Sequence, residues 1–340
     1  MPMLTEKLIK DITPNQSLIS EALQDKLRAK AFNITPKNVE EIIIKRWDLL
    51  KYIYPFFKEL CQTNLQIKPD VILPRLWDLL LPLAIKIASR HQQLQRPFIQ
   101  GILGGQGTGK TTTCKVINLI LSHLKYRTLS LSIDDLYKTY QARLILQQQD
   151  PRLIWRGPPG THDIDLGLNL LDNILQRQTR ITVPRFDKSL HSGNGDRTLP
   201  ETVENIDIVL FEGWFVGVYP IDSAAFNAPP PPIITVADKA FAKDMNERLH
   251  YYIPLWQRLD SLILLYPQDY RLSLEWRKQA EHQMKASGKT GMTDLEIEEF
   301  VNYFWKALHP ELFIKPLIES SSVDLVIEIN SNHSFGKIFS

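Results

Sequence analysis

The octapeptide Gly104-Gly105-Gln106-Gly107-Thr108-Gly109-Lys110-Thr111 constrains the fold of this chain more than any other stretch. It matches the pattern G-x-x-x-x-G-K-[ST] at every fixed position. Glycines are needed because the amides of such a loop turn inward around an anion, with dihedral angles that other residues disfavour. An apolar run at residues 98–103 precedes the octapeptide, and a helical pattern at residues 111–124 follows it. This order predicts a phosphate-binding loop between a strand and a helix.

The loop also predicts how a nucleotide is held. Free amides at the start of the following helix, together with the helix dipole, favour bound phosphate. We expect the Lys110 ammonium to reach the β- and γ-phosphates of ATP and the Thr111 hydroxyl to bind Mg²⁺. The predicted nucleotide-binding residues are Gly105, Gln106, Gly107, Thr108, Gly109, Lys110, Thr111 and Thr112.

Short apolar runs that alternate with helical segments predict the fold class. The runs lie at residues 98–103, 128–133, 206–211, 262–265 and 323–329. Helical patterns lie between them, for example at residues 111–124 and 164–176. Strands that alternate with helices indicate βαβ units. We therefore predict an α/β fold with a P-loop NTPase-type parallel sheet and helices on both of its faces.

The first 95 residues have a different pattern and predict a helical N-terminal extension. Apolar residues recur at helical spacing over residues 39–54, and Pro55 is expected to end that helix because proline lacks an amide hydrogen. A second helix is expected at residues 74–90. We thus divide the chain into a helical cap over residues 1–95 and a P-loop domain over residues 96–340.

Composition and charge favour a soluble cytoplasmic protein. The net charge is +2, from 40 basic and 38 acidic residues, without the concentrated basic face that duplex-binding proteins show. No apolar stretch reaches the roughly 18 residues that span a bilayer. Residues 1–14 mix acids and bases and do not resemble a secretion signal. We expect no nucleic-acid or membrane partner, and either a monomer or a small homo-oligomer.

Carboxylates at the ends of two predicted strands narrow the class of P-loop protein. No guanine-reading N-K-x-D tetrapeptide occurs, and the run 206–211 ends in Glu212 where most motor ATPases have Asp. The run 128–133 delivers Asp134 and Asp135 to the edge where open α/β sheets bind ligands. Asp134 could accept the proton of an acceptor hydroxyl or align it with the γ-phosphorus, or could instead cap the next helix. Asp135 could contact substrate or be structural.

With the loop, Asp134 and the pair Glu212-Gly213, the chain resembles the phosphoribulokinase, uridine kinase and pantothenate kinase group of P-loop kinases. That resemblance implies that Asp134 is the catalytic carboxylate and that Glu212 helps to bind Mg²⁺. The predicted Mg²⁺-binding residues are therefore Thr111, Glu212 and Asp134. The group also has P-x-Y-D-x-x-x-H-S near its acceptor site. Residues 184–192 match this motif, with Phe186 in place of the tyrosine, which puts a nucleoside acceptor in doubt.

Further motifs resemble the D-glycerate 3-kinase family of plants, cyanobacteria and fungi. These are residues 156–163 (RGPPGTHD), 186–189 (FDKS), 193–197 (GNGDR) and 288–294 (GKTGMTD). The resemblance runs from about residue 97 to the end of the chain. It implies an enzyme that phosphorylates D-glycerate to 3-phosphoglycerate with ATP, the last step of photorespiratory salvage in phototrophs.

A small anionic acceptor requires cations close to the reacting hydroxyl. The loops at about residues 155–200 supply them, and a segment at about residues 270–294 is expected to form a lid. The predicted substrate-binding residues are Asp135, Tyr137, Arg156, His162, Arg185, His191 and Arg197, with Lys188 as a further candidate cation. Arg277 in the lid is the predicted catalytic arginine, beside Asp134 and Lys110. Each basic residue could equally be a solvated surface charge.

Two alternatives remain open at this point. The same chemistry could serve another small hydroxylated metabolite, such as a pantothenate-, ribulose phosphate- or nucleoside-like acceptor. The chain could also bind nucleotide without catalysing transfer. A nucleotide sensor would not need the Asp134 carboxylate or the basic acceptor loops, so their presence favours an enzyme.

Overall fold

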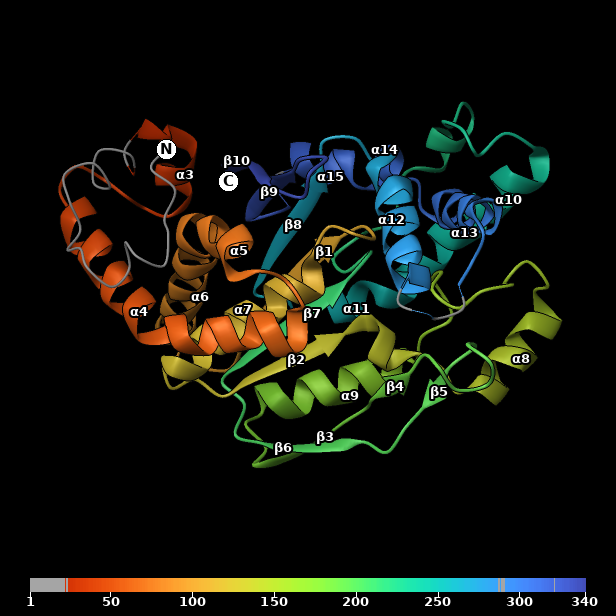
Figure 1. Cartoon of the computed structure of the whole chain (residues 1–340). Coiled ribbons are helices and arrows are strands. Elements are labelled where there is room, and N and C mark those ends of the chain that lie inside the picture. The colour runs from red at the N-terminus through yellow and green to blue at the C-terminus, as the bar shows by residue number, and fades with distance from the viewer. Residues whose placement is uncertain (1–21, 23, 287, 289–290, 321) are drawn as a thin grey trace.

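A computed structural model of the chain describes residues 22, 24–286, 288, 291–320 and 322–340. The segment of residues 1–14 and two residues of the 288–294 motif, Lys289 and Thr290, lie outside the described residues. The main strands are β1 (Phe98–Gly104), β2 (Thr128–Ser132), β7 (Ile208–Gly213), β8 (Ser261–Pro267), β9 (Leu325–Ile329) and β10 (Phe335–Phe339). They form one sheet in the order β10-β9-β8-β1-β7-β2 (Figure 1).

The five strands from β9 to β2 pair in parallel, and β10 joins the edge in antiparallel orientation. The predicted α/β fold with a parallel sheet is therefore confirmed. Strand β10 was not predicted; it follows β9 after a short turn, so a hairpin rather than a crossover connects the two. The run predicted at residues 206–211 starts and ends two residues later in the structure.

Helices cover both faces of the sheet, as predicted. Alternate residues of β1 point to opposite faces: Phe98 and Ile102 belong to one apolar cluster, Ile99 and Leu103 to another. The first cluster is closed by α4 (Val39–Leu60), α6 (Leu81–Leu94) and α7 (Lys110–His123). The second is closed by α9 (Ile164–Leu175), α10 (Val236–Arg248) and α13 (Asp294–Ala307). These two layers fix the strand ends that carry the candidate site.

The N-terminal helices share the first apolar cluster with the sheet. The prediction that Pro55 ends its helix is wrong: Pro55 lies inside α4, which continues to Leu60. A proline inside a helix costs about 3 kcal/mol. Burial of a large apolar side chain stabilises by roughly 1.5–3 kcal/mol. Tyr54 and the fully buried Phe57 therefore offset the cost of continuing past the proline.

The second N-terminal helical region is longer than predicted. Helical backbone runs from α5 (Pro69–Arg75) through a π-helical turn at Leu76–Leu80 into α6, so the predicted start at Pro74 was wrong. Pro69 occupies the first turn of α5, where its missing amide hydrogen is not needed. The short helix α3 (Lys26–Ala31) lies against β10.

The segment at residues 184–200, expected to be a loop, contains a small hairpin of β4 (Phe186–Asp187) and β5 (Asp196–Arg197). It is flanked by β3 (Arg180–Val183) and β6 (Glu201–Glu204), which pair with each other. The remaining helices are α8 (Tyr140–Gln149), α11 (Ile253–Trp256), α12 (Leu272–Ala286), α14 (Pro310–Phe313) and α15 (Lys315–Glu319). Within the described ranges, no helix combines the length and apolarity that a membrane crossing requires.

Candidate active site

The predicted phosphate loop leaves the sheet at the end of the buried strand β1 and leads directly into α7. Residues 105–112 all fall in this loop or in the first turn of α7. Gly107 and Gly109 have φ angles of +78° and +86°, in the left-handed region that favours glycine. A Cβ atom on Gly107 would also lie 2.6 Å from the Cβ of Trp276. Glycine is thus required at position 107 both by the backbone and by the close approach of α12.

Lys110 lies over this loop. Its Nζ donates a hydrogen bond to the carbonyl oxygen of Gly105 (2.9 Å), which also accepts one from the Thr108 hydroxyl (2.8 Å). Burial lowers the pKa of Lys110, and the nearby carboxylates of Glu212 and Asp134 counteract that effect. A buried ammonium held against a carbonyl is well placed to exchange that weak partner for a phosphate oxygen.

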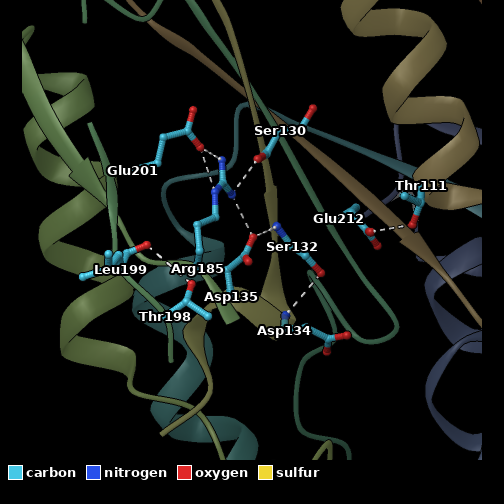
Figure 2. Close-up of polar contacts among 10 residues, drawn as sticks. All are labelled: Thr111, Ser130, Ser132, Asp134, Asp135, Arg185, Thr198, Leu199, Glu201 and Glu212. Carbon is cyan, nitrogen blue, oxygen red and sulfur yellow. Dashed lines mark hydrogen bonds and ion pairs between the residues drawn. The ribbon is translucent and has the colours of Figure 1, made fainter. Parts of the chain in front are cut away.

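Thr111 and Glu212 meet beside the loop. The Thr111 hydroxyl donates a hydrogen bond to Oε1 of Glu212 (2.9 Å), as Figure 2 shows. Glu212 pairs with Ile102 of β1 on one side and with Ser132 of β2 on the other, so it stands between the two strand ends that carry the site. A hydroxyl and a carboxylate are hard oxygen donors of the kind that Mg²⁺ prefers. These two residues could bind a Mg²⁺ ion, and phosphate oxygens would then complete its coordination shell.

The two adjacent aspartates at the end of β2 have different environments. Ser132 and Asp135 cap the short turn Ile133–Leu136: the Ser132 Oγ accepts from the amide of Asp134, and Asp135 accepts from the amide of Ser132 (3.0 Å). Capping is therefore done by Asp135. The Asp134 carboxylate remains for the site, where its Oδ2 lies 2.5 Å from Nζ of Lys188.

Asp134 is held in its ionised form. Its side chain is 25% exposed. Burial raises the pKa of Asp134, but the Lys188 ammonium and a hydrogen bond from Tyr137 lower it further than burial raises it, so the net shift is downward. An ionised carboxylate at this point can accept a hydrogen bond from an alcohol and orient its oxygen. The predicted catalytic role of Asp134 stays a prediction.

Arg185 has partners within the protein on both sides (Figure 2). Its Nη1 lies 3.0 Å from Oδ2 of Asp135 and donates to the carbonyl of Ser130, while its Nη2 lies 2.7 Å from Glu201. The guanidinium thus ties the end of β2 to β6. Substrate binding by Asp135 and Arg185 remains a prediction, and it would have to compete with these bonds.

His162 is buried beside Asp134 and stacks on Tyr137, with 4.6 Å between ring centroids. The Tyr252 hydroxyl accepts from the amide of Gly160 (2.9 Å) and lies 2.7 Å from Nδ1 of His162. The other ring nitrogen, Nε2, is a buried atom for which the described residues supply no partner. Sequence reasoning missed Tyr252, since nothing in the sequence around it indicates contact with a residue 90 positions earlier.

His162 gives the protein a specific pH dependence of stability. Burial lowers the pKa of His162 to about 3, against an unfolded value near 6.5. Below pH 6.5, His162 binds a proton in the unfolded chain but stays neutral in the folded chain, so the free energy of unfolding falls. Between pH 7.5 and 5.5 the expected loss from this residue is about 1.4 kcal/mol.

Urea unfolding of the wild type, His162→Gln and His250→Gln at both pH values measures this loss. His162→Gln should lose about 1.4 kcal/mol less than the wild type between the two pH values. His250→Gln, which alters an exposed histidine, should behave as the wild type does. Equal pH dependence in all three proteins would contradict a buried neutral His162.

The other predicted substrate-binding residues surround Tyr137. Arg197 donates to the Tyr137 carbonyl (2.9 Å) and to Asp163 (2.8 Å). Arg156 donates to the carbonyl of Gly193 (2.7 Å) and lies over the Tyr137 ring. His191 stacks on Tyr140 and lies 3.2 Å from Asp196. The structure thus brings Tyr137, Arg156, His162 and Arg197 together, whereas His191 lies at the rim of the hairpin.

Comparisons with known proteins agree with this geometry. No protein-family model matches the chain. The chain is 31% identical over 231 residues to the chloroplastic D-glycerate 3-kinase of Arabidopsis thaliana, a match that covers 64% of this chain and 49% of that protein. The chain therefore spans about half the length of this relative. It is 33% identical over 221 residues to the uncharacterized kinase mug58 of Schizosaccharomyces pombe, covering 62% of this chain and 79% of that one.

A solved structure matches as well. D-glycerate 3-kinase from Cryptococcus neoformans var. grubii has a TM-score of 0.66 and 27% identity, over 76% of this chain and 96% of its own. The chain belongs to the D-glycerate 3-kinase family of P-loop kinases. The predicted family is thus confirmed. As a member of this family, the chain is an ATP-dependent kinase.

In this kinase, helix α12 occupies the place expected for a lid. Trp276 packs on Gly107 and donates its indole hydrogen to the carbonyl of Ser331 (3.0 Å), which anchors α12 on the phosphate loop. Arg277 lies 3.0 Å from Glu281 and 5.5 Å from the ring of Phe300, so its contacts are within α12 and with α13. The predicted catalytic role of Arg277 would require this guanidinium to leave Glu281.

An apolar pocket adjoins the phosphate loop of the kinase. Its walls come from the loop, from the ends of β7 and β8, and from α12 to α14. They include Gln106, Trp214, Tyr266, Tyr270 and Phe304. Trp214, on its wall, donates its indole hydrogen to the carbonyl of Gly157 in the acceptor loops (3.3 Å). The chain thus has an apolar pocket directly beside the phosphate loop.

Proposed function

We propose that this kinase transfers the γ-phosphoryl group of ATP to a hydroxyl of D-glycerate and forms 3-phosphoglycerate. The observation that carries the proposal is the ionised Asp134 carboxylate beside a lysine at the edge of the sheet that also holds the phosphate loop. The names of the Arabidopsis and Cryptococcus relatives support glycerate as the acceptor. If so, the enzyme would act in photorespiratory salvage in the cytoplasm of a phototroph, as a monomer or small homo-oligomer.

The proposed transfer assigns one role to each group. The acceptor oxygen, oriented by Asp134, bonds to the γ-phosphorus while the bond from that phosphorus to the bridging oxygen of ADP breaks. The hydroxyl proton passes toward the Asp134 carboxylate. Lys110 and the loop amides hold the β- and γ-phosphate oxygens as negative charge shifts to ADP. When bound by Thr111 and Glu212, Mg²⁺ would supply further positive charge to those oxygens.

A coupled assay of ADP release tests the proposal. D-glycerate should stimulate release well above the rate with ATP alone, and NMR of the product should identify 3-phosphoglycerate rather than the 2-isomer. A panel of hydroxylated acids and polyols provides the comparison. A higher kcat/KM with another member of the panel would replace D-glycerate as the acceptor while leaving the kinase chemistry intact.

The apolar pocket favours one second candidate, a larger acceptor with an apolar portion such as a pantothenate-like compound. Val301→Phe would fill part of the pocket from α13. If glycerate is the acceptor, kcat/KM should change by less than about threefold, because a compact anion gains nothing from apolar surroundings. A loss above about tenfold in a protein with an unchanged melting temperature would assign the pocket to the acceptor site.

A further inference from the structure

Lys188 and Asp134 form an ion pair at the mouth of the site. The lysine Nζ lies 2.5 Å from Oδ2 of Asp134, and the lysine side chain is 61% exposed while that of Asp134 is 25% exposed. Lys188 begins the turn between β4 and β5, within the Phe186-Asp187-Lys188-Ser189 motif. The contact therefore joins the proposed catalytic carboxylate to a cation whose stem is in solvent.

The turn that carries Lys188 is well anchored. Asp187 accepts from the amide of Ser189 (2.8 Å), and Arg143 donates to the carbonyl of Asn194 (2.8 Å). Arg156 donates to the carbonyl of Gly193 on the same turn. A fixed backbone with an exposed, flexible lysine stem lets the ammonium move a short distance without rearranging the loop.

Asp134 cannot serve Lys188 and an acceptor equally. Lys188 contacts Oδ2 of Asp134, and Tyr137 donates a hydrogen bond to the same carboxylate, so an alcohol that donates its hydrogen to Asp134 competes with these partners. Because Asp134 is half-buried, the pair is not broken freely, and the ammonium then needs a new anion close by. An acceptor with a carboxylate beside its hydroxyl supplies that anion, whereas a neutral alcohol does not. The exchange thus favours anionic acceptors.

Most neighbouring cations have other partners, whereas Arg156 contacts the carbonyl of Gly193 and the rings of Tyr137 and Phe186. Arg185 pairs with Asp135 and Glu201, and Arg197 pairs with Asp163. Lys110 lies on the phosphate loop. Lys188, by contrast, is paired with the carboxylate that the acceptor must engage.

We propose that Lys188 determines specificity: it exchanges Asp134 for an anionic group that the acceptor carries next to its reacting hydroxyl. The proposal rests on the kinase function given above but not on glycerate being the acceptor. Before the acceptor binds, the same ion pair covers part of the Asp134 carboxylate. Lys188 thus links recognition of the acceptor charge to release of the catalytic carboxylate.

The test compares one anionic and one neutral acceptor that differ in a single group. D-glycerate and its amide, glyceramide, are such a pair. In Lys188→Met, kcat/KM for D-glycerate should fall roughly 10- to 100-fold, the range for hydrogen bonds to charged groups, while that for glyceramide should change less than about threefold. Lys188→Arg should recover much of the loss, and Lys243→Met, at an exposed lysine of α10, should leave both values unchanged. The KM for ATP should be the same in all variants.

Two kinetic results would overturn the proposal. An equal loss with both compounds would mean that Lys188 supports transfer itself and does not select the acceptor. No loss with either compound would mean that the ion pair has no part in catalysis.

Calorimetry of the same two compounds gives an independent measure without turnover. Binding of D-glycerate that weakens in Lys188→Met while glyceramide is unaffected supports the proposal even if D-glycerate is not phosphorylated. In that case the glycerate function fails and the role of Lys188 stands. Binding of D-glycerate that is indifferent to Lys188 overturns the proposal.

Discussion

Replacement of Asp134 by asparagine is expected to lower kcat by about a hundred- to ten-thousandfold, the usual contribution of a positioned acid–base group. The change removes the negative charge and the proton acceptor but keeps the size of the side chain. ATP binding should change less than about threefold, since the loop amides, Lys110 and Thr111 lie on other elements. Stability should be little affected, because Ser132 and Asp135 cap the turn without help from the Asp134 side chain.

Steady-state ADP release gives kcat, and calorimetric titration with an ATP analogue gives the dissociation constant. Asp165→Asn is the matched control, since Asp165 is an exposed aspartate in the first turn of α9. A variant at position 134 that keeps more than about a tenth of wild-type turnover would remove Asp134 from the mechanism. Equal loss of turnover and of nucleotide affinity would place Asp134 in the nucleotide site instead.

The parts of this protein that could be predicted from sequence are those that local rules determine. The phosphate loop needs glycine at positions 107 and 109, and the structure has positive φ at both. The apolar runs became parallel strands because each is short and apolar, and a helix follows all of them but the last, β9. Asp134 could be placed because parallel strands deliver their following residues to one edge of the sheet.

The remaining features depend on contacts between distant segments. Whether Asp134 or Asp135 caps the turn is decided by Arg185, which lies 50 residues later and pairs with Asp135. The sequence therefore left both roles open for Asp135. Helix α4 passes Pro55 because its apolar face packs against the sheet, a gain that helix propensity does not include.

Arginines were the least predictable part of the site. A basic residue in a glycine-rich loop has the same local pattern whether it binds substrate or holds the loop. Arg197 bonds the carbonyl of Tyr137 and the carboxylate of Asp163, and Arg277 bonds Glu281. Only the folded chain shows these partners. Each arginine would have to exchange its existing bond for one to the substrate.

Lys110→Met should have opposite effects on activity and on stability. Loss of the ammonium that faces the phosphates is expected to lower kcat/KM by about a hundred- to a thousandfold, the range for one electrostatic group at a transition state. The free energy of unfolding without nucleotide should stay the same or rise. Burial already lowers the pKa of Lys110, which means that the folded protein holds this charge at a cost that methionine does not have.

The structure explains why Lys110→Met leaves no carbonyl without a hydrogen-bond partner. The Gly105 carbonyl that accepts from Lys110 also accepts from the Thr108 hydroxyl, so it keeps a hydrogen bond in the variant. Steady-state ADP release gives kcat/KM, and urea unfolding with and without ATP gives the stability and the effect of bound nucleotide on it. Lys115→Met, at an exposed lysine on the same helix, is the control. A clear loss of stability in nucleotide-free Lys110→Met would show that the lysine stabilises the loop. It would contradict the inference that burying this ammonium destabilises the folded protein in the absence of phosphate.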